Sequence, residues 1–221
     1  MWRPRTLLIT DRVRLREATG ADDDAAMVAY VAAAAEAGVD AVQVRDRAAD
    51  DRHLLRLVRQ IVEALAGSGC RVLVNERAHV AWAAGADGVH LRSDGVAAVR
   101  LRDAWPSVQT IGRSVHRDDG PDAAAAVDYV VFGTVFASGS KGPDAPVAGL
   151  SALRAWVERS TVPVLAVGGM ELERCIAVRR AGAAGIAAID LFARAYAAGA
   201  DRLAATVREV HAVFNDGEQT A

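Results

Sequence analysis

A phrase that recurs along the chain limits its fold more than any other feature. AGVDAVQVR at Ala37–Arg45, AGADGVHLR at Ala84–Arg92 and AGAAGIAAID at Ala181–Asp190 share one layout, and AVDYVVFG at Ala126–Gly133 is a looser copy. Each copy starts with Ala, usually followed by Gly, and runs into a short apolar stretch, which is typical of a helix C-terminus followed by a buried strand. Such junctions predict a chain of alternating strands and helices.

Eight strands complete this pattern. We expect them at Thr6–Thr10, Ala41–Arg45, Arg71–Asn75, Gly88–Leu91, Thr110–Ser114, Tyr129–Phe132, Val164–Val167 and Gly185–Ile189. Amphipathic segments that predict helices are Asp23–Glu36, Asp51–Ala66, Leu150–Glu158, Glu171–Arg180 and about Asp201–Phe214. Even spacing favours closure into a (β/α)₈ TIM barrel, one α/β domain over residues 1–221 with a polar, flexible tail at 215–221. The alternative is an open, doubly wound sheet.

The composition argues against several other classes of protein. Of the 221 residues, 52% are hydrophobic and 24% are charged, as in soluble globular proteins, and a net charge of −2 gives no basis for nucleic-acid binding. No run of about 18 apolar residues lacks charge, so we expect no membrane span, and the apolar run Leu7–Ile9 is too short for a signal peptide. Cys70 and Cys175 lie far apart, which argues against a disulfide framework or a zinc site and for a cytoplasmic location.

Polar side chains stand where the expected strands end, and in a barrel these ends form the mouth. Gln43, Arg45 and Arg47 alternate along the chain, so they can share one face and bind an anionic substrate. The alternative is that the two arginines form surface ion pairs. Their nearby acidic partners would be Asp40, Asp46 and Asp50.

Further polar groups follow other strands. Ser114 and His116 end the fifth strand, where a histidine beside a serine can exchange protons near neutral pH, although a lone histidine can also be structural. The long loop Phe132–Gly149 carries Lys141 and predicts a lid over the substrate, or else an ordinary loop. Gly168 and Gly169 end the seventh strand, where backbone N–H groups can approach an anion.

Together these motifs resemble those of the thiamine phosphate synthase / thiazole tautomerase (TenI-like) family. The resemblance covers about Thr6 to Phe214. Its motifs are QxRxR at Gln43–Arg47, NER at Asn75–Arg77, ADGVHL at Ala86–Leu91, GRSVH at Gly112–His116, DYVVFGTVF at Asp128–Phe136, Lys141, and PVLAVGGM at Pro163–Met170. The family is a (β/α)₈ barrel that acts on small molecules such as thiazole phosphate, and its members are often homo-oligomers.

The family contains two activities. The synthase joins a pyrimidine diphosphate to a thiazole phosphate with the help of magnesium, and the resemblance implies that Gln43, Arg45 and Lys141 would hold the diphosphate, with Arg47 as a third basic group. The tautomerase isomerises a thiazole carboxylate phosphate without a metal, and the resemblance implies that His116 is its acid/base group.

Three positions depart from the family pattern, two of them at the metal site of the synthase. Glu76 stands where a magnesium-binding Asp is usual, and the second metal Asp falls at Gly95, so a synthase would have to bind Mg²⁺ through Glu76 and the adjacent Asp94. Asp190, next to Ile189 at the end of the eighth strand, replaces a phosphate-binding Ser. A carboxylate repels phosphate unless it is protonated, paired or turned away, and Arg194 one helical turn on is the expected partner.

We therefore expect a tautomerase-like enzyme that needs no cofactor. His116, with Ser114 beside it, would move a proton on the thiazole carboxylate. The substrate-binding set would be Gln43, Arg45, Arg47, Asn75, Lys141, Gly168, Gly169, Ile189 and Asp190. The first alternative is a Mg²⁺-dependent synthase. The second is a barrel without catalytic activity that binds a thiazole- or phosphate-like ligand for regulation.

Overall fold

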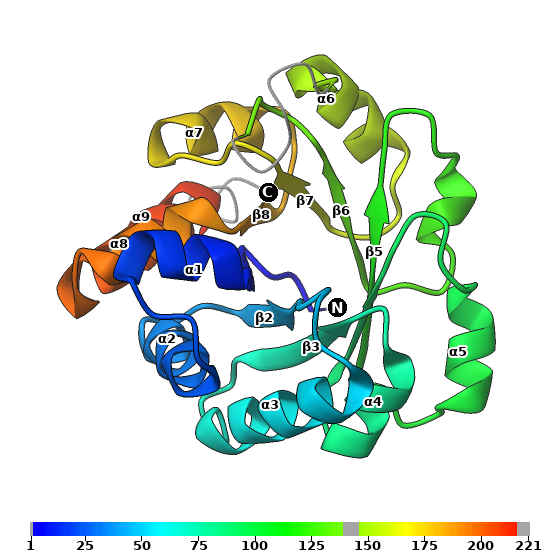
Figure 1. Cartoon of the computed structure of the whole chain (residues 1–221). Helices are drawn as coiled ribbons and strands as arrows, with labels where there is room; N and C mark the ends of the chain where they lie inside the picture. Colours follow the sequence, from blue (N-terminus) through cyan, green and yellow to red (C-terminus); the bar gives the residue numbers. More distant parts are fainter. Residues whose placement is uncertain (1, 139–145, 216–221) are drawn as a thin grey trace.

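The chain forms a closed barrel of parallel strands surrounded by helices (Figure 1). The computed structural model describes residues 2–138 and 146–215. Strand order around the barrel follows the sequence from β1 to β8, and β1 pairs with β8 through Leu7 and Ala187. The predicted TIM barrel is confirmed. The open-sheet alternative is wrong, because the first and last strands share hydrogen bonds.

Every strand ends within one residue of its predicted bounds. The strands are β1 (Thr6–Ile9), β2 (Ala41–Val44), β3 (Arg71–Asn75), β4 (Gly88–Leu91), β5 (Thr110–Val115), β6 (Tyr129–Gly133), β7 (Val164–Val167) and β8 (Gly185–Ala188). The Ala-Gly junctions before β2, β4 and β8 predicted these strands well, because each junction marks the change from a helix end to a fully buried strand.

The helices were predicted less completely. The predicted helices are present as α2 (Asp24–Glu36), α3 (Asp51–Ala64), α6 (Gly149–Arg159), α7 (Leu172–Arg180) and α9 (Ala200–Asn215). The helices that sequence analysis missed are α1 (Arg12–Thr19), α4 (Ala78–Ala84), α5 (Ala98–Ala104), α8 (Asp190–Ala197) and the 3₁₀ turn η1 (Pro121–Ala124). They are short, and α1 buries only Leu15, so their apolar periodicity is weak. The Asp11 N-cap and the left-handed Gly20 mark the ends of α1 and could have revealed it.

Two layers of apolar side chains stabilise the barrel. Alternate strand residues such as Leu8, Val42 and Val74 pack under the helices. The lumen holds a separate cluster. Its buried members are Leu7, Ile9, Ala41, Leu73, Tyr129, Val131, Leu165 and Ala187. The lumen is therefore filled with side chains, and ligand space is left at the mouth.

Three further predictions from the sequence concern the cysteines, membrane spans and the C-terminal tail. Cys70 and Cys175 are free and buried, so neither forms a disulfide. No helix in the described part of the chain is both long and apolar enough to cross a membrane. Asn215 ends α9, and the remainder of the predicted tail, 216–221, lies outside the described residues.

Candidate functional site

Two adjoining cavities lie at the carboxyl ends of the strands. One, here called the central cavity, has a volume of about 410 Å³ and is lined by residues at the ends of all eight strands. The other, the flank cavity, has a volume of about 520 Å³ and lies between α1, the β7–α7 loop and the start of α8. Ser138, Val167, Gly168 and Ile189 line both cavities, so the two share a common wall.

The barrel brings most of the predicted site residues to these cavities. The central cavity is lined by Gln43, Arg45, Arg47, Asn75, Asp94, Ser114, His116, Gly168 and Ile189. Gly169 and Asp190 line the flank cavity. Glu76 is in the lining of neither cavity, and Lys141 lies outside the described residues. This gathering follows from the parallel strands, whose carboxyl ends all meet at one rim.

Gln43 carries an unused hydrogen-bond acceptor at the floor of the central cavity. The residue is only 3% exposed, and its Nε2 donates to Asn75 Oδ1 at 2.8 Å. The other end of the amide, Oε1, is buried and has no hydrogen-bond partner among the described residues. An unpaired buried polar atom is costly, so this oxygen is placed to accept a hydrogen bond from a bound ligand.

Two arginines give the rim of the central cavity a positive charge. Arg45 Nη1 lies 3.2 Å from Asp11 Oδ2, and Arg47 has no ion pair within the described residues. Burial, and then the neighbouring charge of Arg47, lower the pKa of Arg45. The two guanidinium groups therefore lie near each other, as in a site for an anion with several negative charges.

The predicted alternative partners of these arginines are engaged elsewhere. Asp40 accepts from Thr6, Asp46 accepts from Arg12 at 3.0 Å, and Asp50 caps α3. The ion pairs that we considered with these three carboxylates are therefore wrong. The reason is that β1 and α1 bring their own polar groups closer to Asp40 and Asp46, and Asp50 is used to begin a helix.

His90 links Tyr129 and Ser114 by two hydrogen bonds, a contact that sequence analysis missed. Its Nδ1 lies 2.9 Å from Tyr129 Oη, and its Nε2 lies 3.0 Å from Ser114 Oγ, which faces the central cavity. Burial, followed by the charge of Arg113, lowers the pKa of His90 to about 3, so the ring is neutral and carries one N–H. His90 thus fixes the orientation of Ser114. Strand alternation could have found it, because Val89 and Leu91 belong to the helix-facing layer.

His116 presents at the rim a ring nitrogen, Nε2, that has no hydrogen-bond partner among the described residues. Its Nδ1 lies 2.8 Å from the carbonyl oxygen of Gly133, which can only accept, so Nδ1 carries the proton. Its backbone N–H donates to Asp119 Oδ2 at 2.7 Å, and its carbonyl accepts from Trp156 Nε1. In the neutral ring Nε2 is then an acceptor, as a general base requires.

The candidate metal ligands are bridged by an arginine. Arg92 Nε lies 3.5 Å from Glu76 Oε1, and its Nη2 lies 2.7 Å from Asp94 Oδ2. Within the described ranges, no three His, Cys, Asp or Glu side chains come together in a way that could hold a metal ion. Mg²⁺ requires nearly octahedral oxygen ligands, and a guanidinium group lies between the two predicted ligands. The arrangement of these three side chains does not fit a magnesium site. Mg²⁺ binding through Glu76 and Asp94 is still only a prediction.

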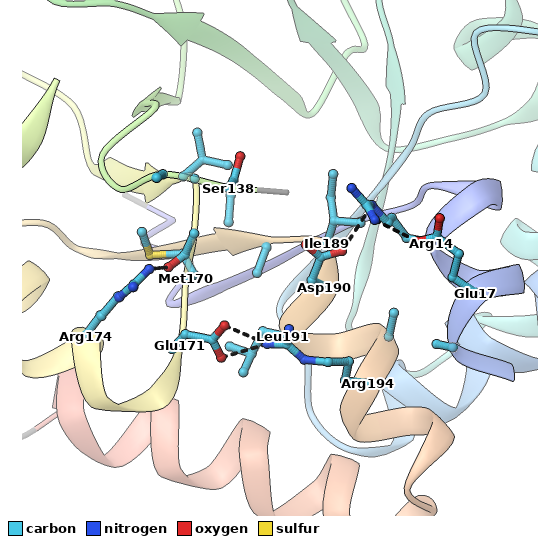
Figure 2. A pocket seen from close by; sticks show the side chains of 18 residues that line it. Arg14, Glu17, Ser138, Met170, Glu171, Arg174, Ile189, Asp190, Leu191 and Arg194 are labelled. Carbon is cyan, nitrogen blue, oxygen red and sulfur yellow. Dashed lines mark hydrogen bonds and ion pairs between the residues drawn. The ribbon is translucent and has the colours of Figure 1, made fainter. Parts of the chain in front are cut away.

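The flank cavity corrects one predicted ion pair. Arg194 does not pair with Asp190, because its Nη2 lies 2.7 Å from both carboxylate oxygens of Glu171 at the start of α7 (Figure 2). Asp190 instead faces α1, with Oδ1 at 3.5 Å from Arg14 Nε. The i,i+4 spacing allowed the predicted pair, but the neighbouring helices supply other partners.

The two glycines after β7 allow the next loop to approach closely. Both have positive φ, and a Cβ on Gly168 would lie 2.3 Å from Thr134 Cγ2. A Cβ on Gly169 would lie 2.3 Å from the carbonyl oxygen of Ala137. Any larger residue would push the β6–α6 loop away from the shared wall of the cavities. Anion binding by their N–H groups stays a prediction.

The known proteins that this chain resembles in sequence are thiamine-phosphate synthases. A sequence model of the family described as Thiamine monophosphate synthase matches residues 15–192. A thiamine-phosphate synthase of Anaeromyxobacter dehalogenans is 39% identical over 192 residues, which cover 86% of this chain and 84% of that protein. The enzyme of the same name from Roseiflexus is 32% identical over 209 residues, covering 94% of this chain and 84% of its own.

Solved structures of other proteins superimpose on this fold. A thiamine phosphate pyrophosphorylase from Pyrococcus furiosus superimposes with a TM-score of 0.77 at 29% identity, over 94% of this chain and 97% of that one. A 3-hexulose-6-phosphate synthase, at 18% identity and a TM-score of 0.61, is similar in fold alone.

Proposed function

The chain belongs to the thiamine monophosphate synthase family, and from this premise we propose that it is a transferase that joins a pyrimidine diphosphate to a thiazole. The names of the relatives support the synthase alternative of the sequence analysis rather than its tautomerase expectation. In the reaction the bond between the pyrimidine methylene carbon and the diphosphate oxygen breaks, and the electron pair leaves with diphosphate. The lone pair of the thiazole nitrogen forms the new C–N bond, so no proton has to move.

The observation that carries this proposal is the unpaired Oε1 of Gln43 beside a cationic rim. A buried acceptor suits the exocyclic amino group of the pyrimidine that thiamine contains, with Asn75 holding the Gln43 amide in place. Arg45 and Arg47 would bind the diphosphate and stabilise the negative charge that it gains as it leaves. Ser114, oriented by neutral His90, would give the ring a further polar contact.

Magnesium is the cofactor that the family resemblance implies for this activity. Since the carboxylates of Glu76 and Asp94 are bridged by Arg92, we assign charge neutralisation here to the arginines of the rim. Lys141, which lies outside the described residues, would add one more cation from the loop after β6.

The test is to mix the protein with pyrimidine diphosphate and a thiazole, as the alcohol and as the phosphate, and to measure diphosphate release and thiamine products by chromatography. Arg45→Ala should lower kcat/KM at least about tenfold, because hydrogen bonds to charged groups are typically worth about 1.5–3 kcal/mol. Arg208→Ala, an exposed arginine on α9, is the matched control. Absence of product with both thiazoles would refute the proposed function.

Tautomerisation is the second candidate, and it is favoured by the Nε2 of His116, which has no hydrogen-bond partner among the described residues. His116→Asn should then slow aromatisation of the thiazole carboxylate phosphate by at least about 10²-fold. A near-wild-type rate in this variant would exclude His116 as the acid/base group.

The regulatory alternative is a barrel that binds a ligand without catalysis. Thermal stabilisation of the protein by thiazole phosphate, with no turnover in the transferase or the tautomerase assay, would select it.

A further inference from the structure

We propose that the flank cavity selects a thiazole whose side chain ends in a neutral hydroxyl, rather than a phosphate, and that Asp190 is the selecting residue. The proposal rests on the proposed function, because it concerns the second substrate of that reaction. It predicts that the favoured product is thiamine itself, not its phosphate.

The shape of the mouth places the second substrate at the flank cavity. With a pyrimidine diphosphate over Gln43 and the rim arginines, the remaining space lies across the shared wall, which includes Val167, Gly168 and Ile189. Ile189 borders both cavities, whereas the next residue, Asp190, borders only the flank cavity. A thiazole ring at the shared wall therefore directs its side chain toward Asp190.

The described side chains that line the flank cavity carry no excess of positive charge. Its charged side chains are Arg14, Arg174 and Arg194 together with Glu17, Glu171 and Asp190 (Figure 2). Three cations and three carboxylates leave a formal charge of zero. These side chains therefore supply no net positive charge to offset the two negative charges of a phosphate. The charge balance instead suits a ligand group without a net charge.

Two of the three arginines are already neutralised by carboxylates. Arg194 Nη2 lies 2.7 Å from both oxygens of Glu171, and Arg14 Nη1 lies 2.6 Å from Glu17 Oε2. The third, Arg174, donates to the carbonyl oxygen of Gly169 and lies over the Phe136 ring, 4.8 Å from its centroid. Arg174 is thus used to hold the glycine turn against the loop after β6. A phosphate would have to break these contacts to gain a cation.

Asp190 offers an acceptor in this cavity. Its nearest cation is Arg14 Nε at 3.5 Å, and no hydrogen bond to its carboxylate is formed within the described part of the chain. The side chain is 34% exposed, so solvent and ligands can reach it. A hydroxyl group can donate to this carboxylate in a short, charge-assisted hydrogen bond. A phosphate has no proton to donate when fully ionised, and its charge has the same sign as that of Asp190.

The experiment compares 4-methyl-5-(2-hydroxyethyl)thiazole with its phosphate, each with pyrimidine diphosphate, in the wild type, Asp190→Ser and Asp190→Asn. We expect wild-type kcat/KM to be at least about tenfold higher for the alcohol, the worth of one hydrogen bond to a charged group. Both variants should move the alcohol-to-phosphate ratio toward the phosphate by at least about tenfold. Asp103→Ser, at an exposed carboxylate on α5, is the matched control and should leave the ratio unchanged.

Calorimetric binding of the two thiazoles separates this proposal from the proposed function. Tighter binding of the alcohol to the wild type, reversed in Asp190→Ser, supports the proposal even if no product forms. Product formation with a preference for the phosphate overturns the proposal and leaves the transferase function standing. Equal binding of both thiazoles, or a ratio that Asp190 variants do not move, also overturns it. If Asp190→Ser does not fold, judged by thermal melting, the nearly isosteric Asp190→Asn decides.

Discussion

Replacing His90 and Tyr129 together by phenylalanine should remove one specific part of the pH dependence of stability. His90 is buried between Tyr129 Oη and Ser114 Oγ, and its pKa is lowered from 6.5 to about 3. In the unfolded chain the ring gains a proton near pH 6.5, whereas in the folded barrel it stays neutral to about pH 3. Below pH 6.5 the unfolded state therefore binds more protons, and stability falls as the pH falls.

The size of this loss of stability follows from the difference in proton uptake between the unfolded and the folded state. Between pH 7.5 and pH 5.5 the unfolded ring takes up about one proton while the folded ring takes up none, so the contribution is about 1.4 kcal/mol of unfolding free energy. For a chain of this size that corresponds to a fall of about 3–6 °C in Tm. The wild type should show this loss in addition to the effects of its other titrating groups, and His90→Phe/Tyr129→Phe should lack it.

The measurement is urea unfolding, followed by circular dichroism, at pH 7.5 and 5.5. Tyr129→Phe alone is the matched control, because it removes the hydroxyl partner but keeps the histidine that titrates. His90→Phe alone leaves the Tyr129 hydroxyl buried without its partner and should cost about 1–3 kcal/mol at both pH values, part of which the double variant recovers. If the double variant loses as much stability at pH 5.5 as the Tyr129→Phe control, His90 is not held neutral and the reasoning is refuted.

Three further predictions concern other residues of the barrel. Gln43→Leu removes the unpaired acceptor and should raise KM for the pyrimidine diphosphate about threefold to tenfold, and an unchanged KM in steady-state kinetics would show that Oε1 does not bind the substrate. Tyr30→Phe removes a buried hydroxyl that has no partner among the described residues, so the urea midpoint should stay the same or rise; a loss above about 1 kcal/mol would reveal a hidden partner. Gly169→Ala places a Cβ 2.3 Å from the Ala137 carbonyl oxygen at φ +57 and should destabilise the fold by more than about 1 kcal/mol, whereas Gly67→Ala has open space around the Cβ and controls for the positive φ.

The sequence alone determined the order and the ends of the strands. Ala-Gly junctions precede β2, β4 and β8, and all eight strands are short, buried, mostly apolar runs, so the local pattern was enough to predict them within one residue. The strand ends also predicted which polar residues gather at the mouth, because parallel strands in a barrel share one rim. Short helices such as α1 were not predicted, because few of their side chains are buried and their apolar periodicity is weak.

Only the tertiary structure decided which of these polar groups contact one another. His90 and Tyr129 are 39 residues apart and meet through the register of β4, β5 and β6, with Gly112 between them leaving space for the Tyr129 ring. Arg194 has Asp190 four residues away in the sequence, yet it pairs with Glu171 on α7. The physical reason is that hydrogen bonds and ion pairs depend on distances of a few ångströms, and barrel closure sets those distances between segments far apart in the chain.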